Sequence, residues 1–295
     1  MDLQGKAADY SHARVVVLPA PYEATCSYGM GTSRGPEAIL KASVAAEFYD
    51  EELRLEIDRI GIATLPPPAI ESLKPSAMVK AVYEMTRPVV QAGKIPAGLG
   101  GEHTVTLGFL QAVAEKHTKL SVLQIDAHPD LRDAYEGRRI CHATVGRRIM
   151  EQHPLVQVGL RAFSREEMDL LEAEASSGSG QVRPFSAAWI HSNPEWIESV
   201  VSALGEHVYI SLDLDGLDPS LLPHTGTPEP NGLSWRQVCD LLVRVNETRN
   251  IAGFDIVELA PDSTSRVSDF TAARLCLRMI GLCATPNHKR KPLPF

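Results

Sequence analysis

Short apolar runs rich in β-branched residues alternate with longer, helix-like stretches along this chain of 295 residues, and this alternation limits the folds open to it. The expected strands are residues 14–18, 59–63, 94–97, 120–125, 155–159, 207–212 and 251–256. The expected helices are residues 35–49, 76–92, 105–117, 143–153, 165–174, 194–204, 234–245 and 268–282. Several strand runs are apolar throughout, as in strands covered on both faces. The pattern predicts an α/β fold, a doubly wound, mostly parallel sheet with helices on both faces in three layers.

Composition excludes several classes of protein. A net charge of −8 makes nucleic acid an unexpected partner, because phosphate binding needs clustered Lys and Arg. The five cysteines form no CxxC pair, so neither a disulfide framework nor a zinc ribbon is expected. No signal-peptide pattern opens the sequence, and no apolar stretch reaches the ~20 residues that span a bilayer. We therefore expect one cytoplasmic domain, residues 1–295, without membrane contact.

Acidic and imidazole side chains follow three of the expected strands. Asp126, His128 and Asp130 alternate after one strand, so an extended backbone would point all three to one side. Asp213 and Asp215 follow another strand, and Gly100-Gly101-Glu102-His103 follows a third. In doubly wound sheets, ligands bind beyond the carboxyl ends of the strands. The sequence thus predicts that these side chains meet at one edge of the sheet.

A single Asp at a strand end is most often a helix cap or a turn former. That explanation fails for the whole set, because four converging carboxylates would repel one another and lose hydration. Two divalent cations would offset the charges of Asp126, Asp130, Asp213 and Asp215. A mixture of carboxylate and imidazole ligands without cysteine suits Mn²⁺ and similar metals.

The chain resembles the ureohydrolase family, which includes arginases and agmatinases, along nearly its full length. The matching motifs, in the family's order, are Gly100-Gly101-Glu102-His103-Thr104, Asp126-Ala127-His128-Pro129-Asp130 and Ser211-Leu212-Asp213-Leu214-Asp215-Gly216-Leu217-Asp218-Pro219. Glu102 departs from the Asp that is more common in the first motif, and it precedes the expected ligand. The resemblance implies a single arginase-like ureohydrolase domain with two Mn²⁺ per chain, or another divalent metal such as Ni²⁺ or Co²⁺.

The resemblance also implies a set of metal ligands. One metal would be bound by His103 and Asp130, the other by His128 and Asp215. The carboxylates that would bridge the two metals are Asp126 and Asp213. Such a pair lowers the pKa of a water molecule and so supplies a strong nucleophile. Asp130 is expected to orient this nucleophile as well as to bind metal.

Two further residues are implied in catalysis. Glu258 follows a strand and matches the family glutamate that holds the guanidinium group in a bidentate contact. His142 matches the family's proton-shuttle histidine. On sequence alone, His142 is equally open to a role at a helix start, because residues 143–153 are expected to be helical. Asp255 is expected to be structural.

Loops set which guanidine enters the site. Residues 130–137 resemble agmatinase-like sequences and lack the Asn and Ser pattern with which arginases hold an α-amino acid. We therefore expect a small cationic guanidino substrate, agmatine, converted into putrescine and urea. Aminopropylagmatine, guanidinobutyrate, arginine, guanidine and a non-catalytic metal-binding role remain alternatives. His224 and Asn231 stand where the family has small residues, beside the expected pocket.

Residues 19–32 also resemble the family and are expected to form a loop over the site entrance, with Gly35 and Pro36 opening a helix. Family members form trimers or hexamers, so the resemblance implies a homo-oligomer.

Overall fold

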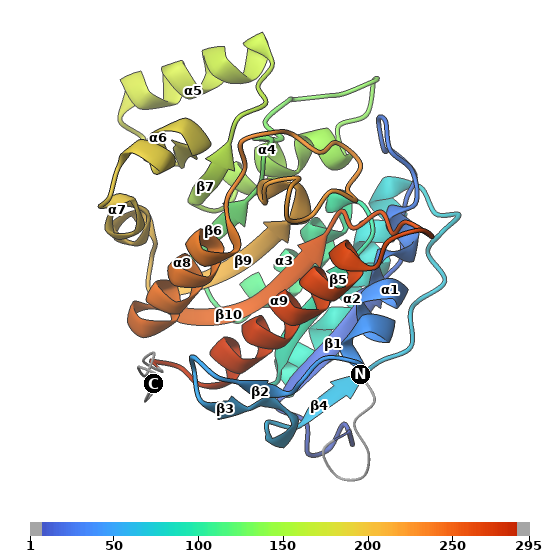
Figure 1. Ribbon diagram of the computed structural model, residues 1–295. Coiled ribbons are helices and arrows are strands. Elements are labelled where there is room, and N and C mark those ends of the chain that lie inside the picture. The colour runs from blue at the N-terminus through green and yellow to red at the C-terminus, as the bar shows by residue number, and fades with distance from the viewer. Residues whose placement is uncertain (1–7, 288–295) are drawn as a thin grey trace.

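A single eight-stranded sheet forms the centre of the protein (Figure 1). The computed structural model describes residues 8–287. The strands of the sheet are β1 (Val15–Ala20), β4 (Ile62–Thr64), β5 (Ile95–Gly100), β6 (Leu120–Ile125), β7 (Leu155–Leu160), β8 (Val182–Ser186), β9 (His207–Asp213) and β10 (Asn250–Val257). Their order is β4-β1-β5-β10-β9-β6-β7-β8, and every neighbouring pair is parallel. The α/β prediction is confirmed, and the described sheet is parallel throughout.

Helices cover both faces of the sheet and bury a hydrophobic core on each side (Figure 1). One face packs against α1 (Gly35–Ser43), α6 (Ala187–Ser192), α7 (Trp196–Ala203), α8 (Trp235–Thr248) and α9 (Val267–Ala284). The other face packs against α2 (Pro75–Gln91), α3 (Thr106–Ala114), α4 (Val145–Met150) and α5 (Arg165–Ser177). Because the inner strands are covered on both faces, most of their side chains are apolar on both sides, which explains the continuous apolar runs.

Two strand regions were missing from the sequence prediction. The expected helix 35–49 ends at Ser43, and the chain continues into an antiparallel hairpin of β2 (Tyr49–Asp50) and β3 (Leu55–Glu56). Strand β8 lies at the edge of the sheet, where Arg183 is exposed. An edge strand tolerates both a charge and Pro184, since its outer backbone groups need no partner.

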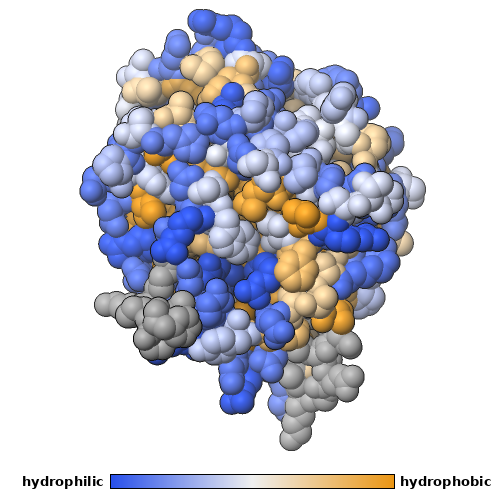
Figure 2. Space-filling model, viewed as in Figure 1, coloured by the Kyte–Doolittle hydropathy of each residue, from blue (hydrophilic) through white to orange (hydrophobic). Residues whose placement is uncertain are grey.

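The surface over α1, α8 and α9 is mostly hydrophilic, with smaller hydrophobic areas between the polar ones (Figure 2). Within residues 8–287, no helix is both long and apolar enough to cross a membrane.

The four central strands, β5, β10, β9 and β6, are direct neighbours and run in one direction. Their carboxyl ends therefore lie side by side, and the chain that leaves each of them carries the polar residues of the site.

Candidate metal centre

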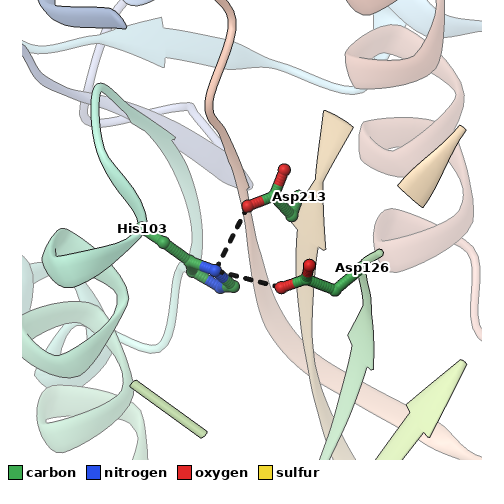
Figure 3. A group of neighbouring side chains, drawn as sticks. All are labelled: His103, Asp126 and Asp213. Carbon is green, nitrogen blue, oxygen red and sulfur yellow. Dashed lines mark ion pairs between the residues drawn. The ribbon is translucent and has the colours of Figure 1, made fainter. Parts of the chain in front are cut away.

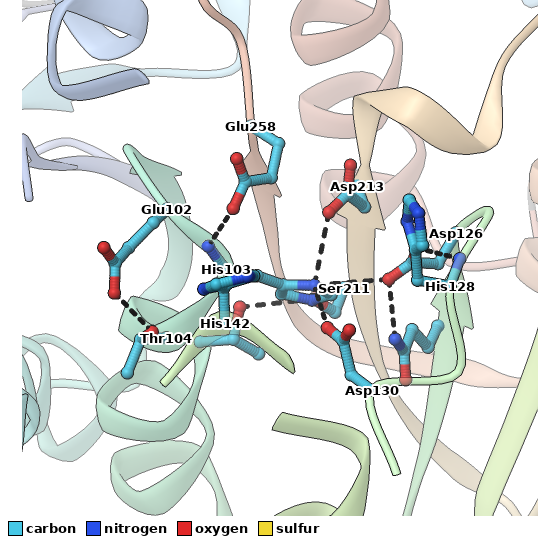
Figure 4. A network of polar contacts seen from close by, with 12 residues as sticks. Glu102, His103, Thr104, Asp126, His128, Asp130, His142, Ser211, Asp213 and Glu258 are labelled. Atoms are coloured by element: carbon cyan, nitrogen blue, oxygen red, sulfur yellow. Dashed lines mark hydrogen bonds and ion pairs between the residues drawn. The ribbon is translucent and has the colours of Figure 1, made fainter. Parts of the chain in front are cut away.

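The predicted residues converge at the carboxyl edge of the sheet (Figure 4). The segment after β6 contributes Asp126, His128 and Asp130. Asp213 ends β9, and Asp215 lies in the short 3-10 helix that follows it. His103 follows β5, and Glu258 follows β10. All of them except His128 are buried.

Three carboxylates surround the imidazole of His103 (Figure 3 shows two of them). Its Nδ1 lies 3.2 Å from an oxygen of Asp126 and 3.2 Å from one of Asp130. The distance from Nδ1 to the nearest oxygen of Asp213 is 3.3 Å. None of these oxygens is placed to accept a hydrogen bond from Nδ1, which is buried without a hydrogen-bond partner.

The other ring nitrogen of His103 fixes how the ring faces the carboxylates. Nε2 lies 3.0 Å from Ser211 Oγ, and that hydroxyl donates its hydrogen to Asp255 at 2.8 Å. Ser211 therefore accepts from Nε2–H, which leaves the lone pair of a neutral ring on Nδ1. A buried lone pair that faces three carboxylate oxygens is unfavourable by itself. A cation between them satisfies all four groups, so the residues present fit a metal ion.

A second group of candidate ligands lies beside the first. His128 Nδ1 lies 3.0 Å from Asp215 Oδ2 and 3.6 Å from Asp126 Oδ1. His103, Asp126 and Asp213 have ligand atoms close enough to hold one ion, and Asp126, His128 and Asp215 could hold another. The two groups share Asp126, an arrangement consistent with a site for two metals.

Hydrogen bonds hold the carboxylates in place. Gln124 Nε2 donates to Asp126 at 2.7 Å, and the amide of His128 donates to the other oxygen at 2.6 Å. The amide of Asp215 donates to Asp213 at 2.9 Å, and that of Ala127 donates to Asp215 at 3.0 Å. Such outer contacts orient ligands and are typical of metal sites.

The charges of this site are unbalanced without cations. Burial and the charges of Asp215 and Asp126 raise the pKa of Asp213 well above its usual range. Burial also raises the pKa of Asp130 to about 7. Burial opposes charge on His128, yet the neighbouring carboxylates raise its pKa to about 12. The cluster thus retains protons that divalent cations would replace.

Two site residues have backbone angles that L-amino acids seldom adopt. The φ angle is 52° at Asp130 and 67° at Glu258. Strain of this kind concentrates at functional sites, where the surrounding structure enforces it. Glu258 Oε1 accepts a hydrogen bond from the amide of His103 at 2.6 Å, and burial raises the pKa of Glu258 to about 8.

A cavity of about 260 Å³ opens above the candidate ligands. Its wall includes Glu258, His142, Arg132 and Tyr135. Residues 26–29 also line it, in agreement with the expected entrance loop. His224 and Asn231 are not among the described residues that line the cavity; the His224 ring lies against Ser268 instead, with Nδ1 2.8 Å from the hydroxyl.

The glycines of the first motif allow close approach of two chain segments. A Cβ atom on Gly101 would lie 2.1 Å from the carbonyl oxygen of Tyr22, and one on Gly100 would lie 2.4 Å from a methyl group of Val105. The chain that follows β1 can therefore pack directly on the chain that carries His103.

Sequence reasoning expected Asp255 to be structural, but it gave no role to Ser211 or Thr25. Asp255 accepts hydrogen bonds from Tyr209, Ser211 and Thr106 and so positions the Ser211 hydroxyl that holds His103. The spacing of Tyr209, Ser211 and Asp213 could have indicated this role, because the three alternate along β9. The structure then places Ser211 opposite Asp255 of β10. Thr25 gave no signal: it hydrogen-bonds with Glu102, and its Oγ1 lies 3.1 Å from His142 Nδ1.

The parallel sheet and the paired ligand groups at its carboxyl edge define an α/β protein with a site suited to two metal ions. The arginase family model matches residues 13–281, so the chain belongs to the arginase family. It is a metal-dependent ureohydrolase.

The chain is similar to ureohydrolases of known name and to a solved structure of one. The chain is 38% identical to an N(1)-aminopropylagmatine ureohydrolase of Synechocystis sp., with 95% of this chain and 92% of the relative covered. It is 34% identical to an agmatinase of Pyrococcus horikoshii, with 96% of each covered. The crystal structure of agmatine ureohydrolase of Thermoplasma volcanium superposes with a TM-score of 0.84 at 32% identity, covering 94% of this chain and 92% of that one.

Proposed function

We propose that this protein hydrolyses N(1)-aminopropylagmatine, releasing urea and leaving a polyamine. The observation that carries the proposal is the set of buried carboxylates around a cavity that also contains Glu258, which suits a cationic guanidino group. The sequence analysis favoured agmatine, but the relative named for the aminopropyl compound has the higher identity, 38% against 34%.

In this proposal His103 and Asp130 would hold one metal and His128 and Asp215 the other, and Asp126 and Asp213 would contribute to holding both. The distances around His103 and His128 support this assignment. Mn²⁺ is the proposed metal because the donors are carboxylate and imidazole, and Ni²⁺ or Co²⁺ suits the same donors. When bound, the two cations lower the pKa of a water molecule and so supply the nucleophile.

The protein's own groups then handle the substrate. Glu258, once ionised, offers two oxygens to the guanidinium, which holds the carbon in line for attack. Asp130 also lines the cavity and would orient the attacking water. His142 lines the cavity and gives a proton to the departing amine.

A substrate panel tests the function. Urea release by the Mn²⁺-loaded protein is measured with aminopropylagmatine, agmatine, guanidinobutyrate, arginine and guanidine. We expect aminopropylagmatine to give the highest kcat/KM, by about 10-fold over agmatine, a difference of about 1.4 kcal/mol in transition-state binding. A higher kcat/KM for agmatine would instead make agmatine the substrate. No urea from any compound, with two metals bound, would refute the catalytic function.

One observation favours a guanidino acid, such as guanidinobutyrate, as a second candidate. Arg132 lines the cavity, with its guanidinium 5.3 Å from the centre of the Tyr135 ring. A cation there would attract a substrate carboxylate and repel an ammonium. Arg132→Ala distinguishes the two: it lowers kcat/KM for guanidinobutyrate if the acid is the substrate, and it leaves or raises kcat/KM for aminopropylagmatine under our proposal.

A further inference from the structure

Glu102 is a buried carboxylate beside the metal centre that does not line the cavity in the part of the chain that the structure describes. Figure 4 shows its side chain directed toward Thr104 and away from Asp126 and Asp213. One oxygen accepts from the amides of Ala24 and Thr25, both at 2.6 Å. The other accepts from the hydroxyls of Thr25 at 2.7 Å and Thr104 at 2.5 Å. Glu102 therefore holds the entrance loop rather than a metal.

Thr25 connects Glu102 to His142. A hydroxyl has one hydrogen to donate, and Thr25 gives it to Glu102, since a carboxylate only accepts. Toward His142, Thr25 Oγ1 can then only accept. It accepts from the backbone amide of His142 at 3.2 Å and lies 3.1 Å from Nδ1. The Nδ1 atom must carry a hydrogen, because otherwise two lone pairs would face each other.

These hydrogen bonds decide which ring nitrogen of His142 carries the lone pair. With a hydrogen on Nδ1, the lone pair of the neutral ring is on Nε2. Nε2 lies 2.8 Å from the hydroxyl of Ser27, an exposed residue that lines the cavity. Nε2 is thus the atom that can take up a proton at the cavity and release it again.

We propose that Glu102 and Thr25 are positioning residues that fix the tautomer and the orientation of His142, so that its Nε2 carries the transferred proton. The inference rests on the proposed function, in which His142 is the proton donor. It also explains why a carboxylate is buried next to a metal ligand without binding metal.

Kinetics of Thr25→Val test the proposal, because valine keeps the shape of threonine and removes the hydroxyl. We expect kcat to fall about 10- to 100-fold, with KM changed less than about twofold and two metals retained. Thr25→Ser should restore kcat to within about threefold, because it restores the hydroxyl. The matched control is Thr104→Val, which removes one donor to Glu102 but leaves the contact with His142; we expect kcat within about threefold of the original protein.

Several kinetic outcomes would overturn the proposal. An unchanged kcat in Thr25→Val would show that the hydroxyl does not position His142. A rise in KM alone would make Thr25 a substrate contact. Loss of metal, or failure of Thr25→Ser to restore kcat, would make Thr25 a purely structural residue.

A second readout needs no substrate. Nitrogen NMR of ¹⁵N-histidine-labelled protein loaded with diamagnetic Zn²⁺, with His142→Ala for assignment, reports which ring nitrogen carries hydrogen. We expect hydrogen on Nδ1 of His142 in the original protein. Hydrogen on Nε2 of the neutral ring would overturn the proposal even if Thr25→Val fails to fold. Hydrogen on Nδ1 together with no urea release would uphold the positioning network and refute the proposed function alone.

Discussion

Asp126 is the residue on which the two groups of candidate ligands depend. One of its oxygens lies 3.2 Å from His103 Nδ1, and the other lies 3.6 Å from His128 Nδ1. Burial works to raise the pKa of Asp126, but the charges of His103 and His128 lower it below the usual range. Asp126 is therefore the carboxylate best kept ionised, and it faces both metal positions.

Replacing this one carboxylate is expected to remove both metals. Asp126→Ala deletes a ligand from each group and leaves His103 and His128 with incomplete sets. Elemental analysis after dialysis should find fewer than about 0.2 metal ions per chain. Asp133→Ala is the control, since Asp133 is an exposed acid on the following loop that pairs with Arg148; it should keep both metals. Two metals per chain in Asp126→Ala would exclude the bridging role.

The sequence pointed to the candidate ligands more clearly than to the residues that support them. Asp126, His128 and Asp130 are alternate positions after a strand, so their spacing predicted that they lie on one side. The segment is in fact bent, with a φ of 52° at Asp130, and the fold rather than an extended backbone brings the three together. Thr25 meets Glu102 and His142 across 77 and 117 positions of sequence. No periodicity relates residues so far apart, because their contact depends on how the entrance loop packs onto Gly101.

Helix α9 and the hairpin β2–β3 are joined by a buried ion pair. Arg278 of α9 donates to both oxygens of Asp50 at 2.9 and 3.1 Å and to Glu52 at 2.8 Å. Arg278 and Asp50 are 5% and 4% exposed, so neither has water as an alternative partner. The pair fixes the hairpin against α9.

Arg278→Ala should destabilise the fold by about 3–5 kcal/mol, because it leaves Asp50 buried without its cation. The free energy of unfolding is measured by urea denaturation. The control is Arg244→Ala, which breaks the exposed pair of Arg244 with Glu198 and should cost no more than about 1 kcal/mol. Equal losses in the two variants would mean that burial of the pair contributes nothing.

Strands could be predicted from the sequence where nearly all of their residues are buried, and not where buried and exposed residues are mixed. Strands β6 and β9 are buried along nearly their whole length and were predicted almost to the residue. Strand β8 contains two exposed positions in five, so its apolar run is broken. The hairpin β2–β3 has only two residues in each strand, which is too short for an alternation to be recognised.

At the scale of the whole molecule, a parallel sheet gathers its functional groups at one edge and with them a concentration of buried charge. Burial and acidic neighbours raise the pKa values of three carboxyl groups at this edge, those of Asp213, Asp130 and Glu258. The stability of the metal-free protein is therefore expected to depend on pH. Assembly into a trimer or hexamer stays a prediction.

The sign of this pH dependence follows from the protons held by each state. Burial raises the pKa of Asp130 to about 7 and that of Glu258 to about 8, against about 3.9 and 4.3 in an unfolded chain. Between those values the folded state binds more protons, so the metal-free protein loses stability as pH rises from about 4 to 8. His128 acts in the same direction above about pH 6.5, because its folded pKa is raised to about 12.

Bound metal replaces these protons, so removal of metal should lower the melting temperature more at high pH than at low pH. Calorimetry of the Mn²⁺-loaded and chelator-treated protein at about pH 5.5 and about pH 8 measures the two differences. We expect the Tm loss on chelation at about pH 8 to exceed that at about pH 5.5 by several degrees. His103, whose pKa the three surrounding carboxylates raise despite its burial, adds to the effect. Asp126→Ala should show little change with chelator at either pH, because it binds no metal to lose. A larger loss at the acidic pH would mean that the acids of the site are ionised without metal and that the cluster is balanced by other charges.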